Sequence, residues 1–280
     1  MHRVFVLGNG ESRKNVDLEA LRQYGKIYGC NAIYRDFTPD ALVCVDAGIM
    51  HEVYSSGYAL ENKCYFRTWS KLPEFIYPTM IESQFFDGWD NGFLVENEKG
   101  NRKEFVFNGT DPNQLARLYE HIIQERPDAD KSDIKLKLGS HGQWVTWVDG
   151  EDKINLIPEE YGGWSAGPIA VRIALEEENP DEVYLIGFDL GSSTELINNI
   201  YKGTTNYNPS DAKVTPSVNW INQHKQNFEA FPDVKFFKVN SAPLGTDATC
   251  QFVEEWKEYQ LFQYIEQENF KLSLDFGWMM

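Results

Sequence analysis

The opening segment from Arg3 to Ser12 constrains the fold of this chain more than any other stretch. Its apolar run, Val4–Leu7, stops at Gly8-Asn9-Gly10, and polar residues follow. Short apolar runs that end at glycines are typical of buried strands followed by tight turns. Glycines let a backbone approach a phosphate or a ribose closely, and the helix after such a turn offers free amides. The segment therefore predicts the first strand and turn of a nucleotide-binding α/β protein.

Strand-like and helix-like segments alternate through both ends of the chain. The predicted strands are short apolar runs at 3–8, 26–30, 41–45, 183–187 and 234–239. The predicted helices between them are 15–21, 168–177 and 220–231. Alternation of apolar strands with helices predicts an α/β fold, with a Rossmann-like, mostly parallel sheet and helices on both faces.

The middle third of the chain, 65–163, loses this alternation, and aromatic residues crowd there among Gly, Asn and Asp. Its spacing predicts a helix from Pro112 to Gln124 with Asp111 as N-cap. Asp149-Gly150 predicts a hairpin between 144–148 and 154–157. We expect 65–163 to be a lid-like insertion in one nucleotide-binding domain of residues 1–280. Aromatic faces that would hold an acceptor sugar are Trp69, Trp89, Trp144, Trp147 and Trp164.

The composition limits the class of partner. The chain has 26 Lys and Arg against 43 Asp and Glu, a net charge of −17 that repels nucleic-acid phosphates and anionic lipid. Nucleic-acid polymers are therefore poor partners, whereas a single nucleotide is not excluded. The four cysteines are widely spaced and no histidine stands at zinc-ligand spacing, which predicts reduced thiols and no metal site.

Two further expectations concern the ends of the chain. It begins directly with a strand, and no run reaches about 18 apolar residues, so we expect a cytoplasmic protein without a transmembrane segment. The segment 250–269 predicts a final helix. Its apolar stripe could form a homo-oligomer interface or pack on its own sheet.

Short polar side chains follow five of the predicted strands, namely Asn9, Asn31, Asp46, Asp189 and Asn240-Ser241. The carboxyl ends of parallel strands share one edge of a sheet, and ligands bind outside that edge. Each residue alone is equally typical of a helix cap or a turn. Their joint placement favours a binding site.

The segment Ser165-Ala166-Gly167-Pro168 predicts a helix start with Pro168 at the first helical position. The free amides and the positive end of the helix dipole would face an anion such as a phosphate. The alternative is a capped helix without a ligand. Arg172, one turn inside, is expected to make a structural ion pair.

Four motifs in this order resemble the bacterial sialyltransferases of glycosyltransferase family 42. They are V-L-G-N-G-E-S at 6–12, G-C-N-A-I-Y at 29–34, S-A-G-P-I-A-V-R-I-A-L at 165–175 and V-Y-L-I-G-F-D at 183–189. The first and third motifs are also similar to the archaeal-type 6-hydroxymethylpterin diphosphokinase-like family. The resemblance leaves the middle third of the chain unmatched.

The family resemblance implies a Rossmann-like sheet that holds CMP-sialic acid as substrate, with no metal and no other cofactor. Asn9 and Asn31 would contact the nucleotide and its phosphate, Ser165 and Gly167 would lie beside the donor, and Gly187 and Asp189 would close the pocket. Gly8, Gly10, Asp46 and Ala166 complete the expected nucleotide-binding set. The reaction would be an inverting transfer of the sugar to a hydroxyl of a glycan or another acceptor.

The chain departs from the family at two positions. Leu190 follows Gly187-Phe188-Asp189 where the family pattern soon has a tyrosine, so Tyr201 and Tyr207 are the candidates to contact the leaving phosphate. The family histidine before the penultimate helix is also missing. His224, inside that helix, is the nearest candidate base, although a solvent-facing helical histidine is the alternative. His51 and His141 are further candidates.

Three functions follow from these observations. The first is a metal-independent glycosyltransferase that uses a nucleotide-activated sugar. The second is an ATP- and Mg²⁺-dependent diphosphokinase-like transferase, with Asp46 and Asp189 holding the metal. The third is a non-catalytic nucleotide-binding accessory protein that keeps the fold and lacks the base.

Overall fold

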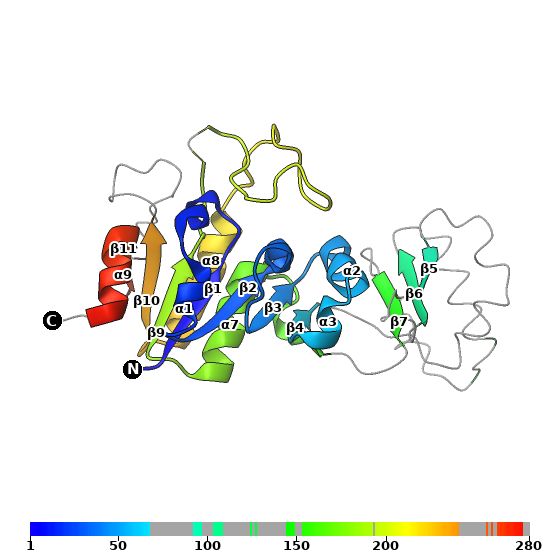
Figure 1. The fold of residues 1–280 in the computed structure, drawn as a ribbon, viewed down its shortest axis with the longest axis horizontal. Coiled ribbons are helices and arrows are strands. Elements are labelled where there is room, and N and C mark those ends of the chain that lie inside the picture. The colour runs from blue at the N-terminus through cyan, green and yellow to red at the C-terminus, as the bar shows by residue number, and fades with distance from the viewer. Residues whose placement is uncertain are drawn as a thin grey trace. The chain divides into compact units, whose positions relative to one another are not determined.

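The computed structural model describes residues 1–67, 92–96, 103–108, 124, 127, 144–148, 153–192, 194–240, 256, 259 and 262–276. The chain forms two compact units (Figure 1). Met1–Cys44 and Glu159–Met280 make the first unit, and Val45–Pro158 make the second.

The first unit is built on six parallel strands. They are β1 (Arg3–Leu7), β2 (Lys26–Cys30), β3 (Ala41–Cys44), β9 (Glu182–Ile186), β10 (Lys235–Asn240) and β11 (Phe262–Glu266). Their order is β11-β10-β9-β1-β2-β3, and every neighbouring pair is parallel. The five predicted strands of this sheet are confirmed to within one or two residues. The chain order reverses between β1 and β9, which is the position where open α/β sheets bind ligands.

Helices cover both faces of this sheet, as the sequence predicted. They are α7 (Ala166–Glu178), α8 (Val218–Ala230) and α9 (Gln267–Phe276). Tyr184 of β9 stacks on Phe237 of β10, and Phe270 of α9 covers it. Phe236, the neighbour of Phe237, contacts Phe228 of α8 instead. Because consecutive strand residues point to opposite faces, α8 and α9 lie on opposite sides of the sheet.

The helix that follows β1 is shorter than predicted. A 3₁₀ turn at Glu11–Asn15 precedes α1 (Leu18–Leu21), so the helix starts three residues later than the expected 15–21. Asp17 is its N-cap, and its carboxylate accepts a hydrogen bond of 3.1 Å from the Ala20 amide. A second 3₁₀ turn, Asn31–Arg35, follows β2, and a third spans Glu159–Tyr161.

The second unit contains α2 (Ala47–Ser55), α3 (Tyr58–Glu61), β4 (Cys64–Phe66), β5 (Gly92–Glu96), β6 (Lys103–Asn108), β7 (Trp144–Val148) and β8 (Ile154–Leu156). The predicted hairpin is wrong, because β7 pairs antiparallel with β6 while β8 pairs parallel with β4. Backbone bonds from Cys64 to Lys153 and from Ile157 to Phe66 extend that parallel pair beyond its strands. Each of the two strands therefore pairs with a partner distant in sequence.

Several predictions for the middle of the chain fall outside the described residues. These are residues 112–123 of the helix predicted at 112–124 with its cap Asp111, the turn Asp149-Gly150, His141, Trp69 and Trp89. The second unit begins at Val45, twenty residues before the predicted insertion, because α2, α3 and β4 belong to it. Its role as a lid stays a prediction.

The predicted final helix at 250–269 is wrong over its last part. Residues 262–266 form β11, which pairs with β10, and α9 starts only at Gln267. The outer edge of β10 carries unpaired amides and carbonyls, and a further strand satisfies them. Trp256 from the predicted stripe is fully buried, and its indole nitrogen donates to the Ile221 carbonyl at 3.3 Å. This side chain packs inside the protomer, and a homo-oligomer stays a prediction.

The thiols behave as predicted where they are described. Cys30, Cys44 and Cys64 are buried and unbonded to other cysteines. Burial raises the pKa of the Cys30 thiol to about 12, with the Arg13 charge opposing the rise. The Cys30 thiol is therefore protonated and unreactive at neutral pH.

Candidate functional site

The loops after β1 and β9 continue to pair beyond the strands. The Gly8 amide donates to the Ile186 carbonyl and the Gly10 amide to the Gly187 carbonyl, each at 2.8 Å. A Cβ on Gly8 would lie 2.5 Å from the Gly187 oxygen, and one on Gly10 would lie 2.5 Å from the Asp189 carboxyl. Gly187 itself has a φ of +73°. These three glycines therefore pack two loops onto each other, and their predicted contact with a nucleotide stays a prediction.

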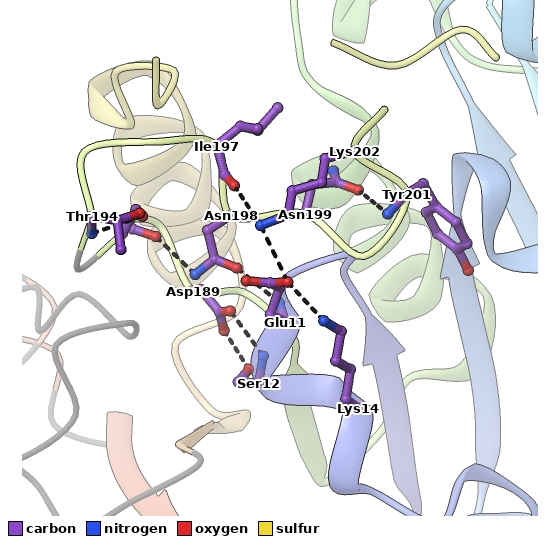
Figure 2. Close-up of polar contacts among 12 residues, drawn as sticks. Glu11, Ser12, Lys14, Asp189, Thr194, Ile197, Asn198, Asn199, Tyr201 and Lys202 are labelled. Atoms are coloured by element: carbon purple, nitrogen blue, oxygen red, sulfur yellow. Dashed lines mark hydrogen bonds and ion pairs between the residues drawn. The ribbon is translucent and has the colours of Figure 1, made fainter. Parts of the chain in front are cut away.

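Asp189 joins the same two loops through its carboxylate (Figure 2). One oxygen accepts from the Ser12 amide at 3.0 Å, and the other accepts from the Ser12 hydroxyl. Only 3% of Asp189 is exposed, and this burial raises its pKa while the Ser12 bonds oppose the rise. Because both carboxylate oxygens bond Ser12, Asp189 holds the opening loop in place and does not face solvent.

An arm, defined as residues 195–214, follows these loops. Its two sides are held together by a bridge between Leu196 and Lys213 and by two backbone bonds, from the Val214 amide to the Glu195 carbonyl and from the Ile197 amide to the Ala212 carbonyl. Its base is bound to the opening loop, because Asn198 accepts from the Glu11 amide at 2.9 Å (Figure 2). The tip of the arm, 203–208, is closed by the Gly203 amide, which donates to the Asn208 carbonyl at 2.8 Å.

Glu11 adds charge to this attachment. Its carboxylate contacts Lys14 at 2.7 Å and Lys202 of the arm at 3.4 Å (Figure 2). The hydrogen bond from Lys14 is the main cause that lowers the pKa of Glu11. These groups are partly exposed, so we expect each ion pair to contribute little to stability.

The arm tip meets the ends of β1 and β2 at Tyr207. The Tyr207 hydroxyl accepts from the Asn9 side-chain amide and from the Ala32 backbone amide, both at 3.3 Å. Asn9 also donates to the Cys30 carbonyl at 3.1 Å, which fixes the orientation of its amide. Asn31 lies between these groups with a left-handed φ of 51°. The structure thus brings the predicted residues Asn9, Asn31 and Tyr207 together.

Tyr201 anchors the arm beside this point. Its hydroxyl accepts from Arg13 at 3.0 Å and donates to Asp36. Arg13 is only 3% exposed and lies 3.7 Å from the Asp36 carboxylate. Arg35 lies 5.7 Å and 5.8 Å from the ring centres of Tyr201 and Tyr207. Burial raises the pKa of both tyrosines, so both hydroxyls keep their protons at neutral pH.

The helix start at 165–168 differs in register from the prediction. Ser165 is the N-cap and α7 begins at Ala166, so Pro168 occupies the third helical position rather than the first. The Ser165 amide donates to the Gln223 side chain at 2.9 Å, and the Ser165 side chain does not cap the helix. Within the described residues, no hydrogen bond reaches the Ala166 or Gly167 amide. Two amides at the positive end of a 13-residue helix are thus unused.

Phe188 lies between the opening loop and α7. A Cβ on Gly8 would lie 3.3 Å from its ring, and one on Gly167 would lie 2.8 Å from it. Asn9, Asn31 and the start of α7 therefore share one edge of the sheet, as predicted, and an aromatic ring fills the space between Gly8 and Gly167. A ligand at this edge has to bind on the β1–β2 side, against Asn9.

His224 is placed differently from the prediction. Its exposed fraction is 0%, so the expectation of a solvent-facing histidine is wrong. Its ring packs against Phe188, Phe228 and Trp256, and neither ring nitrogen has a hydrogen-bond partner among the described residues. Burial lowers the pKa of His224 to about 3, with the Lys238 charge as a smaller cause. A fully buried ring does not reach a substrate hydroxyl, and a pKa this low means that it does not take up a second proton at neutral pH. The structure therefore gives no support to a base at this position.

The remaining predicted residues lie elsewhere. Asp46 belongs to the second unit, where it precedes α2, and desolvation raises its pKa while nearby Arg67 opposes the rise. His51 lies in α2 of the same unit. Within the described part of the chain, no group of three or more His, Cys, Asp or Glu could hold a metal ion. The roles of Asp46 and His51 stay predictions.

Sequence reasoning missed the charged residues that hold the arm, Arg13, Arg35 and Asp36. The available signal was their position directly after the polar turns that end β1 and β2. Arg172 was predicted to make a structural ion pair, and its guanidinium lies 3.9 Å from the Glu176 carboxylate. It also lies over the rings of Tyr161 and Trp164 at 5.5 Å each, so Trp164 has a packing role.

No protein-family model matches this sequence, and no curated protein matches it either. The chain is similar to three solved structures of the sialyltransferase CstII. One, from Campylobacter jejuni in complex with the substrate analogue cytidine-5'-monophosphate, has 12% identity and a TM-score of 0.35, over 90% of this chain and 89% of that one. A mutant of the alpha-2,3/8-sialyltransferase CstII has 14% identity and a TM-score of 0.34, over 90% of each chain. A complex with trisaccharide acceptor and CMP has 12% identity and a TM-score of 0.38, over 97% of this chain and 98% of that one.

One general feature concerns membranes: of the helices in the described residues, none has both the length and the apolarity needed to cross a bilayer.

Proposed function

We propose that the edge formed by Asn9, Ala32 and the start of α7 binds a nucleotide. The observation that carries this proposal is that the Asn9 side-chain amide and the Ala32 backbone amide point at one oxygen, at the carboxyl edge of a parallel sheet and beside the point where its strand order reverses. The amides of Ala166 and Gly167 at the start of α7 have no partner among the described residues. Backbone and amide N–H groups at such an edge are suited to phosphate and base oxygens. The negative net charge of −17 is compatible with a small anion held locally, not with a nucleic-acid polymer.

The reaction that fits this edge is transfer of a sugar from a nucleotide-activated donor to an acceptor hydroxyl. The N–H donors would stabilise the charge on the departing phosphate, and this chemistry needs no metal. The order of the four sequence motifs, which resembles the sialyltransferase pattern, favours a CMP-activated sugar. Inversion at the anomeric carbon and a glycan acceptor belong to the same proposal.

A specific observation favours a second candidate, a nucleotide-binding protein without catalysis. Transfer to a hydroxyl needs a group that accepts its proton, and His224 is buried with a pKa lowered to about 3. The ATP- and Mg²⁺-dependent alternative fits less well, because Ser12 engages both oxygens of Asp189. The transferase and the non-catalytic protein would both bind a nucleotide, but only the transferase would turn it over.

Nucleotide binding is tested by thermal shift and calorimetry with CMP, UMP, GMP, AMP and ATP, with and without Mg²⁺. We expect CMP to raise the melting temperature without Mg²⁺, because it binds only the folded state. Asn9→Ala removes one N–H donor of the edge and should weaken CMP binding about tenfold. Asn219→Ala, at an exposed position of α8, is the matched control and should bind CMP unchanged.

Circular dichroism of Asn9→Ala verifies its fold, because this variant also loses the bond to the Cys30 carbonyl. Absence of a shift with every nucleotide, or CMP binding by folded Asn9→Ala with the affinity of the unmodified chain, would contradict the proposal. Release of CMP from CMP-sialic acid in the presence of a trisaccharide separates the transferase from the non-catalytic candidate.

A further inference from the structure

We propose that Tyr207 is an internal occupant of the nucleotide edge, so that its hydroxyl fills the position of a nucleotide oxygen and has to withdraw before a nucleotide binds. Two N–H groups, the Asn9 amide and the Ala32 amide, converge on this one oxygen at 3.3 Å. That is the arrangement in which proteins hold a phosphate or carbonyl oxygen of a ligand. The inference rests on the proposed function and adds an autoinhibitory contact to it.

The Tyr207 hydroxyl satisfies the hydrogen-bonding groups of this edge only in part. Both bonds to the Tyr207 hydroxyl are longer than the usual 2.9–3.0 Å of an N–H···O bond. The Asn9 carbonyl oxygen, Oδ1, is buried without a hydrogen-bond partner among the described residues. Its orientation is fixed, because the other end of the amide donates to the Cys30 carbonyl. A nucleotide carries both acceptor oxygens and ribose hydroxyl donors, so it can satisfy both ends of Asn9, whereas Tyr207 satisfies one.

The attachment of the arm tip is suited to local release. Residues 203–206 are exposed, and Arg35 donates hydrogen bonds to the Thr204 hydroxyl at 2.7 Å and to the Thr205 carbonyl at 3.0 Å. Segments with exposed hydrogen bonds and little apolar burial open at low cost in free energy. The base of the arm keeps its bonds from Asn198 and Tyr201, so the movement involves the tip alone.

An alternative role gives the opposite prediction. If the Tyr207 hydroxyl contacts the leaving phosphate directly, its removal weakens nucleotide binding. If the hydroxyl competes with the nucleotide, its removal strengthens binding. Tyr207→Phe keeps the ring and removes only the oxygen, so the sign of the change in CMP affinity distinguishes the two roles.

The test measures the Kd of CMP by calorimetry on the full chain. We expect Tyr207→Phe to lower the Kd about fivefold, because the competing bonds are lost. Arg35→Gln loosens the tip without touching Asn9 and should lower the Kd in the same direction. Asp211→Asn, at an exposed position on the arm, is the matched control and should leave the Kd unchanged. Melting temperatures verify that each variant is folded.

A second readout follows the tip in the unmodified chain. Chymotrypsin cleaves after tyrosine, and saturating CMP should accelerate cleavage after Tyr207 because the side chain withdraws. A higher Kd for Tyr207→Phe, an unchanged Kd in both tip variants, or slower cleavage with CMP would overturn the inference while the proposed function stands. If neither the unmodified chain nor any variant binds CMP or another nucleotide, the proposed function fails with it.

Discussion

Replacing Gly8 with alanine is expected to destabilise the first unit by about 3 kcal/mol or more, a large share of the stability of a typical domain. The new Cβ would lie 2.5 Å from the Gly187 carbonyl oxygen and 3.0 Å from its carbon. Both are backbone atoms of a paired loop, which cannot move aside without breaking the bond from the Gly8 amide to Ile186. Denaturant unfolding followed by circular dichroism measures the loss.

Gly163→Ala is the matched control for Gly8→Ala. A Cβ at Gly163 meets no atom within 4 Å, so its free energy of unfolding should change by less than about 0.5 kcal/mol. If Gly8→Ala unfolds like the control, the two loops are not packed as described. In that case the glycines are available to a ligand instead.

His224→Leu is expected to remove an acid-sensitive contribution to stability. The unfolded histidine has a pKa near 6.5, and burial lowers the folded value to about 3. Between these values the unfolded state takes up a proton that the folded state excludes, so stability is complete above pH 6.5 and falls as the pH falls. Between pH 7 and pH 5 the unmodified chain should therefore lose about 2 kcal/mol more unfolding free energy than His224→Leu does.

The comparison between two chains is needed because Asp189 also titrates with a shifted pKa. Its pKa is raised, which has the opposite sign, and it is present in both chains and cancels in the difference. Leucine has nearly the volume of histidine and suits the surrounding Phe188, Phe228 and Trp256. We expect the variant to be at least as stable at pH 7, because two buried nitrogens without partners are removed. An unchanged pH dependence, or a loss of several kcal/mol at pH 7, would show that His224 has a polar role.

The sequence predicted the parts of the fold that depend on local pattern. Strands β1, β2, β3, β9 and β10 read as apolar runs because parallel strands are covered on both faces. The edge strand β11 was missed, because its mixed residues 262–266 continue a helical pattern and only the open edge of β10 selects a strand. The predicted hairpin failed for a similar reason, since the partner of β8 is β4, about ninety residues earlier.

The candidate site was predictable only in part. Position at strand ends was enough to find Asn9 and Asn31, because all parallel strands deliver their carboxyl ends to one edge. His224 stands among polar residues of α8, and its burial is decided by Phe188 and Trp256, which come from distant segments. The cluster of Arg13, Tyr201 and Asp36 depends on where the arm lies, which no local pattern in the sequence states.

The central claim, that a nucleotide binds at the edge formed by Asn9, Ala32 and the start of α7, is tested most directly by hydrogen–deuterium exchange. Exchange is measured on the full chain with and without saturating CMP, and read from peptides that cover 8–12, 30–34 and 164–168. We predict slower exchange in the last two peptides, because the Ala32, Ala166 and Gly167 amides would bond the nucleotide. Slower exchange confined to the second unit, or no change anywhere at a CMP concentration that saturates binding, would contradict the claim.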